Sequence, residues 1–237
     1  MAAFQGAVDL GYRYLETDVH VTTDGVLVAF HDDRLDGITD RRGAIAELPW
    51  SEIRDARVGG LEPIVAFEEL LAAFPEARVN VDPKHDAAVA ALIRIMREPR
   101  VAERLCIGSF SDRRVAEIRE AIGPAACTAL APWEVAALRL GAWGARPLLA
   151  RLRHGAGQCV QIPPSGRWGM PLAERRLIAA AHERGLPVHV WTINEPAEMA
   201  RLLDLGVDGM FSDRAATLRS VLVDRGEWAA LPAARIG

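Results

Sequence analysis

The chain alternates short apolar runs with amphipathic segments almost from end to end, and this alternation constrains the fold more than any other feature. The apolar runs have the length of strands, and the segments between them repeat their apolar residues with the 3.6-residue period of a helix. Strands that alternate with helices of about 10–15 residues indicate βαβ units and a parallel sheet. The predicted strands are Tyr12–Val21, Val26–Phe30, Arg78–Val81, Leu105–Ser109, Cys127–Leu130, Cys159–Ile162, Leu186–Trp191 and Gly209–Phe211. The predicted helices are Met1–Leu10, Val65–Phe74, Ala87–Arg97, Arg113–Ile122, Trp133–Leu140, Leu172–Arg184, Ala197–Leu205 and Ala215–Val223.

Several residues mark where these helices should begin. Asp112 can cap the helix that ends before Gly123. Pro171 and Pro196 suit the first turns of the two helices that follow them.

The number of units indicates a barrel that is one strand short. A chain of 237 residues fits a single TIM (β/α)8 barrel, which takes roughly 250 residues. Counting gives seven strand–helix units if Val26–Phe30 only extends the first strand, and no strand precedes the opening helix. We therefore expect an α/β barrel that lacks its first strand, in one domain over residues 1–237, with a polar loop insertion at about 32–62. The strands around Glu16 and Met210 would then have unpaired edges, which favour oligomers.

Composition excludes several classes of protein. A net charge of −4 does not suit a generic nucleic-acid binder, and no apolar run approaches the ~18 residues of a membrane span. Three scattered cysteines, Cys106, Cys127 and Cys159, form neither a disulfide framework nor a zinc motif. With no secretory signal visible, the sequence predicts a cytoplasmic protein.

The strongest local motif is the strand segment that contains Glu16, Asp18 and His20. Side chains alternate along a strand, so these three should share one face. Two carboxylates at positions i and i+2 near the end of a strand suit Ca²⁺ or Mg²⁺. The alternative is an edge strand whose polar side chains simply face water.

A second motif places Asn80, Asp82 and Lys84 on one face of the next strand. A face with this composition needs partners, because unpaired buried charge is costly. A metal could neutralise Asp82, and a substrate phosphate could pair with Lys84, the only lysine in the chain. The alternative is an internal Asp–Lys ion pair.

Two further residues are candidates for the site. His31 ends an apolar run where the polar segment begins, and histidine is the usual acid or base near neutral pH, although His20 competes for this role. Trp191 ends a late strand and could line the mouth of a barrel, or could equally be a core residue.

Taken in order, these segments resemble the glycerophosphodiester phosphodiesterase family, a family of PLC-like TIM barrels. Glu16-Thr17-Asp18, then Thr23-Asp24-Gly25-Val26 and Phe30-His31-Asp32, are similar to its metal-binding strand, turn and catalytic histidine. The similarity continues through Asn80–Lys84, Ser109-Phe110, Trp191–Asn194, Gly206–Gly209 and Ser212-Asp213, and it covers over nine-tenths of the chain.

The resemblance implies hydrolysis of a small glycerophosphodiester to glycerol phosphate and an alcohol, assisted by one divalent cation, Ca²⁺ or Mg²⁺. It implies that Glu16, Asp18 and Asp82 bind the metal and that His31 is one of two catalytic histidines. It also implies that Lys84 contacts phosphate and that Trp191 lines the substrate pocket.

The sequence departs from the family pattern in two places. Asp82 stands where the family has glutamate, and the chain begins after the point where the family carries His-Arg-Gly and Pro-Glu-Asn-Thr. We expect the cellular protein to extend upstream and to supply these residues. The alternatives are a non-catalytic phosphodiester-binding relative and a sphingomyelinase-D-like phosphodiesterase.

Overall fold

The computed structural model describes residues 1–145, 157–166 and 169–228 of the chain. Its strands are β1 (Tyr14–Val21), β2 (Leu27–Ala29), β3 (Arg57–Val58), β4 (Glu62–Pro63), β5 (Val65–Ala66), β6 (Arg78–Pro83), β7 (Leu105–Ile107), β8 (Cys127–Thr128), β9 (Val160–Ile162), β10 (Val188–Val190) and β11 (Gly209–Met210). Its α-helices are α1 (Ala2–Asp9), α2 (Trp50–Ile53), α3 (Phe67–Ala73), α4 (Asp86–Met96), α5 (Pro99–Ala102), α6 (Asp112–Ile122), α7 (Pro132–Ala142), α9 (Arg175–His182), α10 (Pro196–Leu205) and α11 (Ala215–Asp224). Short 3₁₀ helices are η1 (Leu35–Gly37), η2 (Ile45–Glu47) and η3 (Gly123–Ala125).

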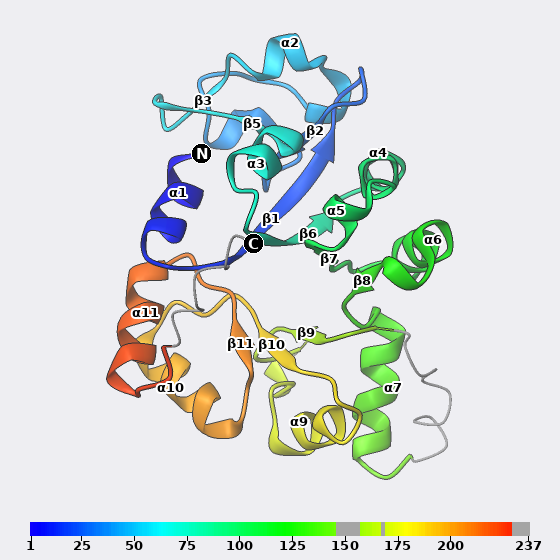
Figure 1. The fold of residues 1–237 in the computed structure, drawn as a ribbon, viewed down its shortest axis with the longest axis vertical. Coiled ribbons are helices and arrows are strands. Elements are labelled where there is room, and N and C mark those ends of the chain that lie inside the picture. The colour runs from blue at the N-terminus through cyan, green and yellow to red at the C-terminus, as the bar shows by residue number, and fades with distance from the viewer. Residues whose placement is uncertain (146–156, 167–168, 229–237) are drawn as a thin grey trace, which may run out of the picture.

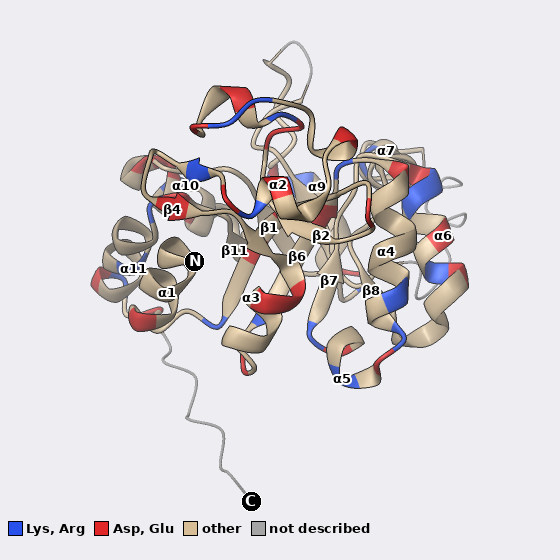
Figure 2. Cartoon of the chain, turned by 90° about the horizontal axis from the view of Figure 1, so that it is seen from above, with Lys and Arg blue, Asp and Glu red and all other residues tan. Residues whose placement is uncertain are grey.

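The parallel strands follow one another in the order β1-β6-β7-β8, and then β9-β10-β11. A parallel bridge between Ala129 and Cys159 joins the two groups. The helices α4, α6, α7, α9 and α10 lie around the outside of this series (Figure 1). Acidic and basic residues are spread along these outer helices and the loops (Figure 2). The predicted TIM-barrel architecture is confirmed, and within the described ranges no ladder joins β11 to β1.

The apolar side of the strands packs against the helices. Val19, Val81 and Ile107 have no exposed surface and lie in a core that includes Leu92 of α4. A second core lies between β9–β11 and their helices. Because side chains alternate along each strand, this packing turns the intervening residues of β1 and β6 toward the inside of the series.

Residues 32–63 form a small folded unit rather than a plain loop. The segment contains η1, η2, α2 and the β3–β4 hairpin. Leu35, Ile45 and Ile53 are fully buried in a cluster of their own, which packs on Val28 and Phe30. In Figure 1 the segment covers one end of β1 and β2.

The structure corrects three details of the sequence reading. The start of the predicted helix Val65–Phe74 is wrong, because Val65–Ala66 is a strand that pairs antiparallel with β2. Pro171 does not begin a helix: it forms a bridge with Ser165, and α9 begins at Arg175. Ser111, not Asp112, caps α6, because the Ser111 hydroxyl accepts a hydrogen bond from the backbone N–H of Arg114.

Candidate active site

Strands β1 and β6 bring the predicted carboxylates onto one face. The two strands are parallel, and their register places Asp18 beside Asp82 and Glu16 beside Asn80. Residues opposite one another in this way share a face of the sheet. The side chains of Asp18 and Asp82 are only 12 % and 17 % exposed. The two aspartates therefore need a positively charged partner nearby.

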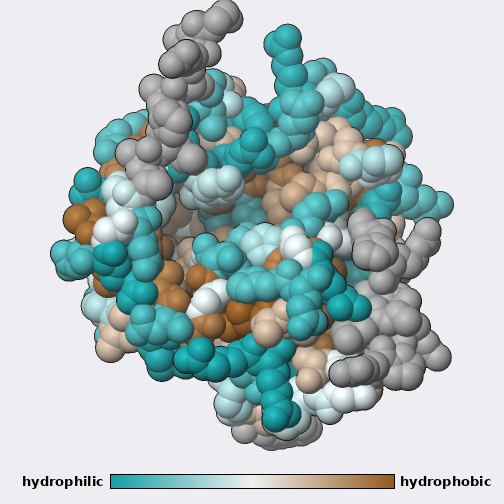
Figure 3. Space-filling model, turned by 60° about the horizontal axis from the view of Figure 1, so that its bottom comes forward, coloured by the Kyte–Doolittle hydropathy of each residue, from teal (hydrophilic) through white to brown (hydrophobic). Residues whose placement is uncertain are grey.

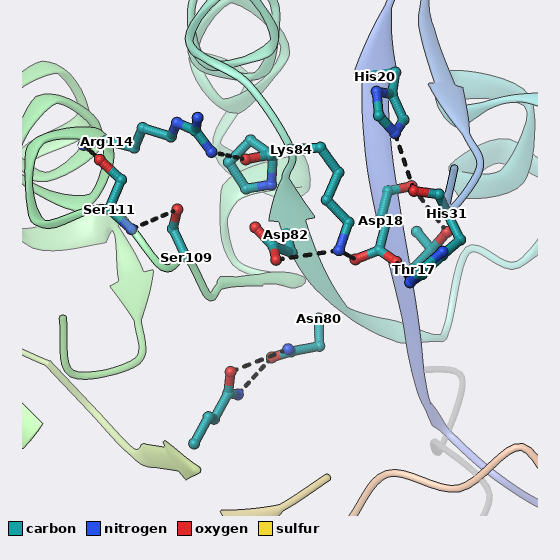
Figure 4. A network of polar contacts seen from close by, with 12 residues as sticks. Thr17, Asp18, His20, His31, Asn80, Asp82, Lys84, Ser109, Ser111 and Arg114 are labelled. Carbon is teal, nitrogen blue, oxygen red and sulfur yellow. Dashed lines mark hydrogen bonds and ion pairs between the residues drawn. The ribbon is translucent and has the colours of Figure 1, made fainter. Parts of the chain in front are cut away.

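Lys84 supplies that charge. Its Nζ lies 2.8 Å from Oδ1 of Asp18 and 3.5 Å from Oδ2 of Asp82, so it bridges the two strands (Figure 4). Burial opposes the charge on Lys84, but the hydrogen bond to Asp18 and the two carboxylates outweigh burial and raise its pKa. The internal Asp–Lys ion pair expected as an alternative is thus present. An ammonium group has three N–H donors, which leaves capacity for a phosphate oxygen.

Glu16 lies close enough to Asp18, Asp82 and Lys84 for their charges to change its pKa. Loss of hydration among the surrounding protein atoms, followed by repulsion from Asp18, raises the pKa of Glu16 to about 7, although the side chain still reaches solvent. Burial, opposed by Lys84 and reinforced by Asp18, also raises the pKa of Asp82. The three carboxylates therefore carry more negative charge than Lys84 balances.

His31 stands at the edge of this cluster. Its Nδ1 lies 2.7 Å from Oδ1 of Asp32, and its Nε2 lies 3.9 Å from Oδ2 of Asp18. A carboxylate only accepts hydrogen bonds, so Nδ1 carries the proton and Nε2 faces the site with its lone pair. The ring is 77 % exposed and can exchange protons with solvent. Asp32 thus orients His31, a role that sequence reasoning did not assign.

His20 lies in a different environment. It is only 3 % exposed, and its Nε2 lies 3.2 Å from the backbone carbonyl oxygen of His31, to which it donates a hydrogen bond. Its ring packs 5.3 Å from the ring of His85, and burial lowers the pKa of both histidines. His20 therefore supports the main chain that carries His31 (Figure 4).

Trp191 directly follows β10 and is half-buried. Its ring meets the ring of Phe110 edge-on, with centroids 5.5 Å apart. Phe110 follows β7 and is 72 % exposed. Both aromatic rings therefore follow the carboxyl ends of parallel strands, the end that binds ligands in this architecture.

An amide bridge across the inside of the strands was not foreseen. Asn80 Nδ2 donates to Gln161 Oε1 at 3.2 Å, and Gln161 Nε2 donates to Asn80 Oδ1 at 2.8 Å (Figure 4). A Cβ atom on Gly108 would lie 2.8 Å from Gln161 Oε1, so the bridge needs glycine there. The polar side chains of Asn80 and Gln161 within apolar strands were the available signal.

The sequence also held no indication of the role of Arg114 in α6. Its Nη1 donates to the carbonyl of Pro83 at 2.9 Å, and its Nε donates to Asp86 at 2.8 Å. Pro83 lies between Asp82 and Lys84, so Arg114 fixes the strand end that carries both.

The chemistry of the carboxylates fits a hard divalent cation. Glu16, Asp18 and Asp82 offer oxygen ligands with excess negative charge, which is what Ca²⁺ and Mg²⁺ require. Within residues 1–145, 157–166 and 169–228, however, no three acidic, histidine or cysteine side chains already form a metal-binding cluster.

One face of the molecule is mostly polar. Hydrophilic residues dominate the face shown in Figure 3, and hydrophobic residues lie around a hollow near its middle. None of the described helices combines the length and the apolar character needed to cross a membrane.

Comparisons with known proteins point to one family. Residues 1–217 match the Glycerophosphoryl diester phosphodiesterase family. The chain is 39 % identical to the probable glycerophosphodiester phosphodiesterase 2 of Mycobacterium tuberculosis, over 96 % of this chain and 86 % of that protein. It also resembles the crystal structure of a putative glycerophosphoryl diester phosphodiesterase from Silicibacter pomeroyi, with a TM-score of 0.75, 24 % identity and coverage of 95 % and 88 %. An Oleispira antarctica phosphodiesterase in complex with the product sn-glycerol-3-phosphate has a TM-score of 0.73 at 20 % identity, with coverage of 94 % and 89 %.

Proposed function

This chain belongs to the glycerophosphoryl diester phosphodiesterase family, and we propose that it hydrolyses a glycerophosphodiester to glycerol phosphate and an alcohol with the help of one divalent cation. The observation that carries the proposal is the position of Lys84 between Asp18 and Asp82, with His31 beside Asp18. A cation-binding face, a phosphate-binding ammonium and a proton carrier thus lie together. The product bound by the Oleispira antarctica phosphodiesterase supports the same substrate class.

Glu16, Asp18 and Asp82 would hold the cation, which supplies Lewis acidity toward a phosphoryl oxygen when bound. Lys84 binds a phosphate oxygen with the N–H that the two aspartates leave free and so orients the phosphorus. Trp191 and Phe110 present aromatic surface to the non-reacting part of the substrate.

His31 transfers the proton. In its neutral form it would accept a proton at Nε2 from the attacking water; in its protonated form it would instead donate one to the leaving alcohol. Asp32 keeps the ring in the tautomer that presents Nε2 to the site. Hydrolysis needs both a base and an acid, and the family resemblance assigns one of these two roles to a second histidine.

The test is release of glycerol phosphate from glycerophosphocholine by the purified protein. We expect activity that a chelator abolishes and that Ca²⁺ or Mg²⁺ restores. Asp82→Asn should abolish activity, whereas Glu198→Gln, which changes an acidic residue of a surface pair with Arg201, should not.

The same assay separates the alternatives. Cation binding without turnover would indicate a non-catalytic phosphodiester-binding protein. Faster turnover of choline lysolipids or sphingomyelin than of glycerophosphocholine would indicate a sphingomyelinase-D-like enzyme. Activity that survives the chelator would contradict the role of the cation.

A further inference from the structure

The three cysteines, far apart in the sequence, gather inside the series of parallel strands. Cys106 of β7 lies opposite Cys127 of β8 in the register of those strands. Cys159 precedes β9 and bridges Ala129, which follows β8 on the same face as Cys127. Three neighbouring strands therefore each turn one thiol toward the inside. None of the three forms a disulfide.

Cys106 and Cys159 are in direct contact. Their Sγ atoms lie 3.8 Å apart, although the residues are 53 positions apart in the chain. A disulfide requires the sulfurs to approach to about 2.05 Å. Because β8 lies between the two cysteines, oxidation has to draw the backbone segments that carry them toward each other. The two strands that carry these residues flank β8, so a bond between them would tie β7 directly to β9.

The two thiols have unequal surroundings. Hydrogen bonding to Cys106, together with the side chains of His189 and Gln161, lowers the pKa of Cys159. Hydrogen bonds to the other two cysteines and burial raise the pKa of Cys106. One member of the pair is thus the better nucleophile, and its neighbour remains a protonated thiol. Cys159 is only 4 % exposed, while Cys106 and Cys127 are half-buried. Access to these thiols from solvent is therefore restricted, which favours a small oxidant.

We propose that Cys106 and Cys159 form an oxidisable dithiol that reacts with hydrogen peroxide to give an intramolecular disulfide. The Cys159 thiolate attacks the peroxide O–O bond and becomes a sulfenic acid, while the leaving oxygen takes up a proton and departs as water or hydroxide. The Cys106 sulfur then attacks the sulfenic sulfur, the S–S bond forms, and a second water departs. In total one peroxide is reduced to two waters and two thiols are oxidised. The inference does not depend on the proposed hydrolysis.

The test is limited peroxide treatment of the folded, chelator-treated protein. We expect loss of two of its three free thiols and a mass loss of about 2 Da, both reversed by dithiothreitol. The three cysteines fall on different tryptic peptides, because cleavage after arginine gives residues 105–113, 120–139 and 154–167. Non-reducing digestion should therefore yield 105–113 joined to 154–167.

Single variants provide the matched controls. Cys127→Ser should still lose about 2 Da, whereas Cys106→Ser should instead gain oxygen on a remaining cysteine. Should Cys106→Ser fail to fold, the cross-linked peptide of the unaltered protein still decides the question. Peptide 120–139 in the cross-link, a disulfide between two chains, or thiols that resist peroxide in the folded protein would each overturn the proposal.

Discussion

Lys84 directly follows β6 and Asp18 lies in β1, and their charged atoms Nζ and Oδ1 lie 2.8 Å apart on the inner face of the sheet. The contact ties β6 to β1 at the point where the register also brings Asp82 alongside. The only lysine of the chain thus holds two aspartates that would otherwise repel each other. Its removal should affect both phosphate binding and the packing of the two strand ends.

Lys84→Met should lower kcat/KM for glycerophosphocholine by roughly 10²–10³-fold, because a preorganised donor to the reacting phosphate is lost. Lys84→Arg keeps the charge but not the compact shape of the ammonium group, so its kcat/KM should lie between those of Lys84→Met and the unaltered chain. Arg201→Met, which removes a cation from a surface pair with Glu198, is the control and should leave kinetics unchanged. Equal kinetics for Lys84→Met and the unaltered chain would contradict the assigned role.

His31→Ala should lower kcat by roughly 10²–10⁴-fold, the usual contribution of a general acid or base. His20→Asn should retain much more activity and lose thermal stability instead, because it breaks the bond to the carbonyl of His31. Asp32→Asn should lower kcat less than His31→Ala does. It should also change the pH–rate profile, since Asp32 acts through the imidazole ring of His31. Steady-state kinetics and melting curves of the three variants measure this. A larger loss of activity in His20→Asn would reverse the assignment.

Glu16→Gln should raise the melting temperature at pH 8 in the presence of a chelator. The folded state holds the proton of Glu16 up to a pKa of about 7, whereas the unfolded chain loses it near 4.3. Folded protein therefore binds more protons between these values, and stability falls as pH rises through this window. The difference between variant and unaltered chain should vanish near pH 4.

Two comparisons sharpen this prediction. Glu198 has a lowered pKa through its hydrogen bond with Arg201, so Glu198→Gln should destabilise at pH 8, the opposite sign. Adding Ca²⁺ or Mg²⁺ should stabilise the unaltered chain more than Glu16→Gln. A melting temperature of Glu16→Gln below that of the unaltered chain at pH 8 would refute the repulsion around Glu16.

Asn80→Ala should lower the free energy of unfolding by about 1–3 kcal/mol, because it leaves the half-buried amide of Gln161 without its partner. Gln161→Ala should behave alike. The double variant should lose less free energy of unfolding than the two single variants together, since only the first removal leaves an amide without its hydrogen-bond partner. Denaturant titration of all four proteins measures the coupling, and simple additivity would show that the bridge contributes nothing.

The sequence predicted the strands and helices well because their periodicity is local. Alternation alone also placed Glu16 and Asp18 on one face, and the register with β6 confirmed that Asp82 lies beside them. Val65–Ala66 was misread as helix because an apolar pair before a helix looks the same whether or not it pairs with a distant strand.

Contacts between distant segments could not be derived in this way. Asn80 and Gln161 are 81 positions apart, and neither segment indicates the other. The choice between His20 and His31 depended on the turn after β2, which buries one ring and exposes the other. The ion pair of Lys84 was foreseen as a possibility, but only the fold shows that it bridges two strands.

The separate core of residues 32–63 has a consequence for motion. Small cooperative units of this kind open locally at a lower free energy than the whole molecule, and amide hydrogen exchange detects such opening. Phe30 anchors the cluster and His31 follows it directly, while Glu16 and Asp18 belong to the main core strand. Local opening would therefore carry the histidine away and leave the carboxylates in register. Amides of η1, η2 and α2 should accordingly exchange faster than those of β1, and His31 would leave the site before the fold was lost.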